Sequence, residues 1–272
     1  MTSTHVLNVP GARLYYEVRG TTGPLLLITA APMAAAAFAP LAEALAGDHT
    51  VVTHDPRGIS RSTLDDPERD STPEVRADDV AALINALGAE TADVFGTSGG
   101  AVTGLALVAR HPGRVRTLIA HEPPLLELLP EAAERRLWIE DLIDTFHREG
   151  QGPAWKEFLA AAEFDDSDDV HAEPPREPSA QALADGAHFF AHEIRGTTRY
   201  VPDIAALKAI PTRIIVGIGS DSGGLDTYRA STALAQLLGT RPVEFPGDHA
   251  GFLAQPQNFA TTLRAVLTDE GA

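Results

Sequence analysis

The sequence Ala92-Asp-Val-Phe-Gly-Thr-Ser-Gly-Gly-Ala-Val-Thr-Gly104 joins a short apolar strand to a helix through a glycine-rich turn. The strand is predicted at Asp93–Phe95 and the helix at Ala101–Arg110, with the pattern Gly-x-Ser-x-Gly centred on Ser98. Such a sharp turn presses together the residues two before and two after its apex, so glycine is needed at both. The Ser98 hydroxyl is exposed at the apex, and the free N–H groups of the helix start point toward whatever it attacks. The stretch therefore predicts a nucleophilic serine.

Seven further runs have the composition of strands, and helical segments separate most of them. Some are continuously apolar, which is typical of strands covered on both faces, and others alternate apolar with polar residues. Strands that alternate with helices favour a mostly parallel sheet with helices on both faces. We therefore expect an α/β fold with an eight-stranded sheet, whose other strands are Val6–Val9, Ala12–Arg19, Leu25–Ile28, Thr50–Thr53, Val115–Ala120, Arg213–Ile218 and Pro242–Phe245.

The alternation stops between residues 130 and 200, where helical segments occur without a clear strand. We interpret residues 130–200 as a helical cap inserted into a sheet domain, which residues 1–129 and 201–272 form together. A chain of 272 residues is long enough for one large α/β domain that buries roughly three quarters of its unfolded surface.

The composition excludes several classes of protein. The net charge of −17 disfavours a nucleic acid or an anionic membrane as a partner. Without cysteine the chain forms neither disulfides nor thiolate metal sites. Met1–Asn8 is short and polar, unlike a signal peptide, and no apolar run approaches membrane-spanning length. We expect a cytoplasmic protein, and the sequence leaves its oligomeric state open.

Five features in a fixed order resemble the α/β-hydrolase family over essentially the whole chain. Two are the turn at Ser98 and the cap-like insertion. The other three are the loops after the third, fourth and last strands, which read Ala30-Ala31-Pro32-Met33, Asp55-x-Arg57-Gly58-x-Ser60-x-Ser62 and Gly247-Asp248-His249. Within the family, His121-Glu122-Pro123-Pro124 looks like the arrangement in zearalenone-type lactone hydrolases, where a glutamate after the sixth strand completes the catalytic triad.

The resemblance implies that His249 is the catalytic base. A serine hydroxyl is a poor nucleophile until a base takes its proton, and imidazole titrates near neutral pH. Of the 10 histidines, His249 lies between the last strand and the last helix, where this family places its base.

The acid that orients the base has two candidates, which both keep the order serine, acid, histidine. Glu122 follows one predicted strand, and two prolines make the exit of that strand rigid. Asp221 follows the next strand, where most of the family keeps its acid in a Gly-x-x-Asp spacing. Counted from Gly219, that position is Ser222, so Asp221 comes one residue early. We favour Glu122 and keep Asp221 as the second choice.

Two backbone N–H groups are needed to stabilise the oxyanion of an acyl-transfer reaction. Gly99 follows the nucleophile and supplies one. The resemblance places the other at Ala31, where Thr29-Ala30 replaces the His-Gly pair common in the family. Pro32 has no N–H and cannot donate.

Two other pairs of polar residues are not expected to carry the chemistry. Asp55 and Arg57 are interpreted as an ion pair that holds the loop after the fourth strand. His188 and His192 are four residues apart and could share a helical face, but no third ligand is evident, and we interpret them as cap residues that line the pocket or face water. We therefore predict no metal and no cofactor.

The sequence favours a serine hydrolase of carboxylic esters or lactones that forms an acyl-enzyme. Two alternatives stay open: a non-hydrolytic enzyme on the same scaffold, such as a lyase or perhydrolase, and a hydrolase-like small-molecule binding protein. Candidate substrate-binding residues are the large apolar side chains of the cap, which suggest an apolar or aromatic acyl group: Leu137, Trp138, Trp155, Phe189 and Phe190.

Overall fold

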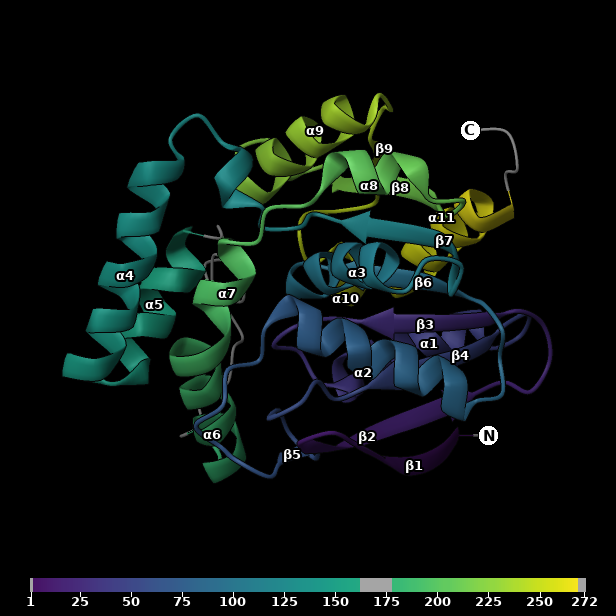
Figure 1. The fold of residues 1–272 in the computed structure, drawn as a ribbon, viewed down its shortest axis with the longest axis horizontal. Coiled ribbons are helices and arrows are strands. Elements are labelled where there is room, and N and C mark those ends of the chain that lie inside the picture. Colours follow the sequence, from purple (N-terminus) through teal and green to yellow (C-terminus); the bar gives the residue numbers. More distant parts are fainter. Residues whose placement is uncertain (1, 162–177, 269–272) are drawn as a thin grey trace.

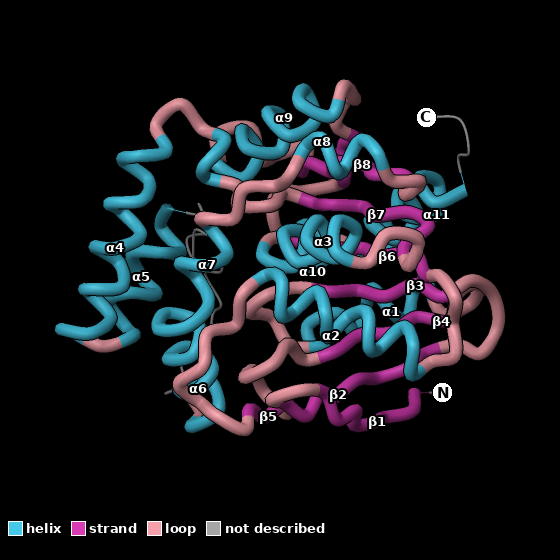
Figure 2. The backbone as a smooth tube through the Cα atoms, viewed as in Figure 1, coloured by secondary structure: helices cyan, strands magenta, loops and turns pink. Residues whose placement is uncertain are grey.

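The computed structural model describes residues 2–161 and 178–268 and contains a mixed sheet of nine strands. Helices cover both faces of the sheet (Figures 1 and 2). The spatial order is β1-β2-β4-β3-β6-β7-β8-β9, with β5 beside β2, and the pairs from β4 to β9 are parallel. The strands are β1 (Thr2–Val9), β2 (Ala12–Arg19), β3 (Leu25–Thr29), β4 (Thr50–His54), β5 (Thr63–Leu64), β6 (Ala92–Thr97), β7 (Val115–His121), β8 (Arg213–Gly219) and β9 (Val243–Phe245).

The sheet has one strand more than the eight predicted. The additional strand, β5, has two residues, which pair antiparallel with Ala12 and Arg13 of β2. Its composition gives no strand signal, because the pairing depends on the path of the loop after β4. β1 is also longer than predicted, since the polar residues Thr2–His5 pair with β2 along the edge of the sheet.

The helices form one layer on each face of the sheet. Side chains of β3 show the two faces, because Leu27 belongs to the hydrophobic core that includes residues of α2, α3, α8 and α9, whereas Leu26 and Ile28 belong to the core that includes residues of α1, α10 and α11. The core helices are η1 (Ala35–Phe38), α1 (Ala39–Leu45), α2 (Pro73–Ala86), α3 (Gly99–Arg110), η2 (Leu126–Leu128), α8 (Ile204–Ala209), α9 (Asp226–Leu238), α10 (Gly251–Ala254) and α11 (Pro256–Thr268).

The remaining helices lie between β7 and β8 in the chain and beyond the carboxyl ends of the parallel strands in space (Figure 1). No strand interrupts them within the described residues. They are α4 (Ala132–Glu149), α5 (Gln151–Ala161), α6 (Ala180–His188), the π-helical segment η3 (Phe189–Glu193) and α7 (Ile194–Thr198). None of the helices described is long and apolar enough to cross a membrane.

The loop after β4 is held by two separate ion pairs, not by the Asp55–Arg57 pair that we predicted. Asp55 is buried and binds Arg61, with 2.7 Å between Oδ2 and Nε. Arg57 extends to Asp79 on α2, with 2.6 Å between Nη2 and Oδ1 and both side chains buried. The prediction was wrong because the sequence does not show which partners the folded loop brings within reach.

His54 ends β4 inside the protein and is held as a neutral imidazole. Its Nδ1 lies 3.3 Å from the Asp55 carbonyl oxygen, and its Nε2 lies 3.1 Å from Thr29 Oγ1. Burial disfavours the imidazolium and lowers the pKa of His54 to about 4.

We predict that replacing His54 with Gln makes stability less sensitive to acid. An unfolded histidine has a pKa of about 6.5, so between that pH and about 4 the unfolded state binds a proton that the folded state does not. The contribution of neutral His54 to the free energy of unfolding is therefore fully present above the unfolded pKa. Below it, this contribution decreases by about 1.4 kcal/mol for each unit by which the pH is lowered. Urea unfolding at pH 7 and pH 5 measures the effect, with the exposed His5→Gln as control. An identical loss of stability in the His54 variant and the wild type would contradict it.

Candidate active site

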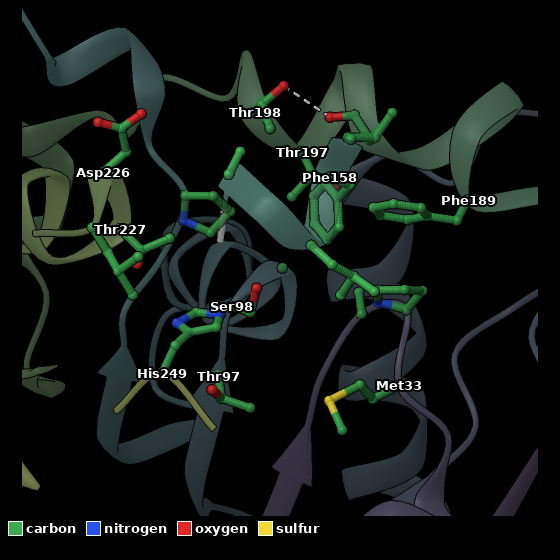
Figure 3. Close-up of a pocket in the computed structure, with 18 of the residues that line it drawn as sticks. Met33, Thr97, Ser98, Phe158, Phe189, Thr197, Thr198, Asp226, Thr227 and His249 are labelled. Carbon is green, nitrogen blue, oxygen red and sulfur yellow. Dashed lines mark hydrogen bonds between the residues drawn. The ribbon is translucent and has the colours of Figure 1, made fainter. Parts of the chain in front are cut away.

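Ser98 lies at a strained turn between β6 and α3, with φ 53° and ψ −126°. The two glycines that flank it are required by close contacts. A Cβ at Gly96 would lie 2.6 Å from the Gly100 carbonyl oxygen, and a Cβ at Gly100 would lie 2.1 Å from that of Thr29. The Ser98 N–H donates to the His121 carbonyl oxygen at 2.9 Å, which fixes the turn to the end of β7. The side chain faces a cavity (Figure 3).

Glu122 and His249 are brought together from the segments that follow two different strands, β7 and β9. Glu122 directly follows β7 and is fully buried, with an unusual positive φ of 47°. His249 Nδ1–H donates to Glu122 Oε2 at 2.6 Å, and the Gly219 N–H donates to Oε1 at 2.8 Å. With Nδ1 protonated, the imidazole keeps Nε2 as its basic atom. His249 lines the same cavity as Ser98.

The environment of Glu122 keeps its carboxylate ionised. Burial by itself would raise its pKa, but the hydrogen bonds from His249 and Gly219 outweigh burial and hold the pKa below its ordinary value. A third donor, Thr227 Oγ1 on α9, lies 3.3 Å from Oε2.

Asp221 has a different position, at the exposed turn after β8. Its Oδ1 accepts a hydrogen bond from Ser220 Oγ at 3.2 Å, and its N–H donates to the Gly247 carbonyl oxygen at 3.0 Å. It does not line the cavity. The structure therefore places Glu122, and not Asp221, against His249 Nδ1.

His121 lies behind the Glu122–His249 pair and, like His54, is kept as a neutral imidazole. Its ring is fully buried, with centroids 5.5 Å from Phe245 and 5.4 Å from Phe259, and it stacks on His249 at 6.4 Å. Burial lowers the pKa of His121 to about 3. Its Nδ1 lies 3.1 Å from Thr97 Oγ1, the residue before Ser98. His121 thus adds packing and no charge to the site.

Ala31 and Gly99, the predicted oxyanion donors, lie side by side at the cavity. A Cβ at Gly99 would come within 2.8 Å of the Ala31 carbonyl oxygen, so the two segments touch. The Gly99 N–H is the first of α3 and has no acceptor within its own helix. Ala31 and Gly99 both line the cavity beside Ser98.

The cavity has a volume of about 530 Å³ and lies between the sheet domain and the segments α4, α5, η3 and α7. Of the predicted substrate-binding residues, Trp138, Trp155 and Phe189 line it. Phe190 does not line it and instead packs against Phe146, with ring centroids 5.5 Å apart. Consecutive helical residues point in different directions, so Phe189 and Phe190 cannot both face the cavity.

Leu137 also differs from its prediction, since it is 67% exposed on the outer side of α4. Met33 also lines the cavity, from the loop after β3 that the sequence had singled out without giving this side chain a role. Other cavity residues were not predicted because they belong to no motif, and they include Arg135, Phe158, Thr197, Asp226 and Thr227. Only their place between a predicted strand and a predicted helix could have indicated from the sequence that Asp226 and Thr227 lie at the site.

His188 and His192 have separate partners in the folded chain. His188 Nε2 lies 2.9 Å from Ser71 Oγ, and His192 Nδ1 lies 3.0 Å from Asp70 Oδ1. In the part of the chain that the structure covers, no group of three or more acidic or histidine side chains could hold a metal ion.

Comparison with known proteins agrees with this architecture. The family model described as "alpha/beta hydrolase fold" matches residues 23–246. The uncharacterized hydrolase YraK of Bacillus subtilis is 35% identical over 270 residues, which cover 97% of this chain and 96% of YraK.

Two solved structures extend the comparison. A thermophilic esterase from Thermogutta terrifontis has a TM-score of 0.72 at 22% identity, over 98% of each chain. The enol-lactonase from Burkholderia xenovorans LB400 has a TM-score of 0.63 at 20% identity, over 97% of this chain and all (100%) of that one. At these identities the two structures demonstrate the shared fold alone. The family model matches well over half of the chain and the similarity to YraK covers 97% of it, and the protein therefore belongs to the α/β-hydrolase fold family.

Proposed function

We propose that the protein is a serine hydrolase of carboxylic esters or lactones that uses Ser98, His249 and Glu122 as a catalytic triad. The observation that supports this most is the 2.6 Å contact between His249 Nδ1 and the buried Glu122 carboxylate. Together with Ser98 at the same cavity, it supplies a nucleophile, a base and an orienting acid.

Acylation of the enzyme would proceed through a tetrahedral intermediate. Ser98 Oγ attacks the substrate carbonyl carbon while His249 Nε2 takes the hydroxyl proton. Glu122 holds the imidazole in the productive tautomer and stabilises the imidazolium. The negative charge that forms on the carbonyl oxygen is bound by the N–H groups of Ala31 and Gly99. When the intermediate collapses, His249 returns the proton to the leaving alkoxide, and the acyl group stays on Ser98.

Deacylation repeats the same steps with water. His249 Nε2 removes a proton from a water molecule, whose oxygen attacks the acyl carbonyl carbon. The second tetrahedral intermediate collapses by breaking its bond to Ser98 Oγ, which regains the proton. The product is the free acid or, from a lactone, the hydroxy acid.

We also propose that residues 130–200 act as a cap that selects the acyl group. Trp138, Trp155 and Phe189 give this side of the cavity large aromatic surfaces, which suit a small apolar or aromatic substrate. The similarity of His121-Glu122-Pro123-Pro124 to zearalenone-type lactone hydrolases adds lactones to the substrates to be examined.

The nucleophile is tested with a fluorophosphonate probe. We expect the probe to label Ser98, and Ser98→Ala to abolish both labelling and the hydrolysis of p-nitrophenyl esters, because a triad acts as a unit. The loss in kcat can reach on the order of 10⁶. Ser3→Ala is the control and should retain full activity. Incorporation of oxygen from isotopically labelled water into the acid distinguishes hydrolysis from lyase or perhydrolase chemistry. Labelling of another residue, or an active Ser98→Ala enzyme, would refute the assignment.

The acid is tested by two matched amide substitutions. Glu122→Gln removes the charge that orients and stabilises His249, which can lower kcat by up to roughly 10⁴. Asp221→Asn alters an exposed turn and should retain most activity. Steady-state kinetics on both variants, with urea unfolding to verify folding, separates the two candidates. The reverse result would assign the role to Asp221, and full activity of both variants would remove the acid from the mechanism.

A further inference from the structure

Two charged side chains face each other on the wall of the cavity. Among the described residues that line the cavity, two carry a formal charge when His249 is neutral. They are Arg135 of α4 and Asp226 of α9. Arg135 Nη2 donates to Asp226 Oδ1 at 3.1 Å, and Arg135 Nε lies 2.7 Å from Oδ2. Figure 3 shows Asp226 beside Thr227 on the wall that also contains His249. The rest of the lining is apolar or carries neutral polar groups.

The pair belongs to a network whose charges sum to zero. Asp226 also binds Arg229 at 3.1 Å, and Arg229 forms an ion pair with Glu131 at the start of α4. Two cations and two anions therefore join α4 to α9. The cavity contains an arginine, yet the network leaves no net charge to attract an anionic ligand.

Arg135 offers no uncompensated charge to an anion in the cavity, because its Nε is buried 2.7 Å from Asp226 Oδ2. A carboxylate at this point would meet the Asp226 carboxylate beside Arg135 and an apolar wall. Moving an anion out of water to such a place is unfavourable unless a net positive charge compensates for it.

We propose that Asp226 is a specificity-determining residue, which neutralises Arg135 and so makes the cavity select uncharged acyl chains over chains that end in a carboxylate. That the selected ligand is an acyl chain rests on the proposed function, but the selection by charge is a property of the cavity itself. Asp226 disfavours acyl chains that end in a carboxylate and does not improve the binding of uncharged chains. Many binding sites obtain specificity in this way.

Asp226→Asn tests this with little change in shape. The substitution leaves Arg135 with its charge uncompensated. The selectivity is the ratio of kcat/KM for the mono-p-nitrophenyl ester of adipic acid to that for p-nitrophenyl hexanoate, whose acyl chain has the same length. We expect the substitution to raise this ratio about tenfold. The effect is no larger because the pair is partly exposed and solvent screens the charge of Arg135. Added salt should reduce the gain.

Two control variants separate local from general charge effects. The double variant Arg135→Gln with Asp226→Asn should restore the wild-type ratio, because it removes the cation as well. Asp144→Asn changes the same charge on an exposed residue of α4 that does not line the cavity, and should leave the ratio unchanged. A raised ratio in Asp144→Asn would attribute the effect to net charge and overturn the proposal.

Ligand binding gives a readout that does not require turnover. Trp138 and Trp155 are the 2 tryptophans of the chain, and both line the cavity, so quenching of their fluorescence reports occupancy. Dissociation constants for dimethyl adipate and for the monomethyl adipate anion are compared in Ser98→Ala and in the double variant Ser98→Ala with Asp226→Asn, so that neither ester is consumed. We expect Asp226→Asn to increase the affinity for the anion about tenfold relative to the affinity for the diester. If no ester is hydrolysed but this shift occurs, the proposed function fails and the charge selection stands. An unchanged ratio in a folded Asp226→Asn protein overturns the inference, whether or not esters are hydrolysed.

Discussion

The burial of the Glu122 carboxylate is the constraint on which the site depends. An ionised carboxylate without partners inside a protein costs several kcal/mol, so its oxygens must find donors. Glu122 obtains them from the end of β8 through Gly219, from α9 through Thr227, and from the loop after β9 through His249. The bonds form only when these three elements have their native places. Satisfaction of one buried charge therefore aligns the base with the cavity.

Backbone crowding at Ser98 provides the second constraint. Gly100 packs so closely on Thr29 that no side chain fits between α3 and the end of β3. This contact brings the Ala31 segment against the start of α3, where the N–H of Gly99 is free of helical bonds. The same glycine that permits the sharp turn thus brings together the two segments, around Ala31 and Gly99, whose N–H groups the proposed chemistry uses. Both constraints act at the carboxyl ends of the parallel strands, where loops from several strands converge.

Helices α4 to α7 are tied to the sheet domain by polar contacts around the cavity. Arg76 of α2 is buried and donates both to Thr197 of α7, at 2.8 Å, and to Thr103 of α3, at 3.0 Å. Thr103 in turn donates to the Gly99 carbonyl oxygen at 3.1 Å. This chain of bonds connects the helix over the cavity with the helix that begins at the nucleophile. The Arg135–Asp226 pair makes a second connection on another side of the cavity. The helices over the cavity are therefore joined to the sheet domain at two separate places, one of which leads to the helix that begins at Ser98.

The sequence by itself determined the order of strands and helices, the turn at Ser98 and the loop that carries His249, because these follow from local patterns of hydrophobicity and glycine. It left open which acid meets His249, since that depends on how neighbouring strands are aligned. Parallel pairing of β7 with β8 sets His121 opposite Gly217, and the next residue, Glu122, then reaches Gly219 and His249. The partners of Asp55 and Arg57, the two-residue strand β5, and the choice of Phe189 over Phe190 at the cavity were likewise decided only in the tertiary structure. Each depends on contacts between segments distant in the chain, and no local pattern records such contacts.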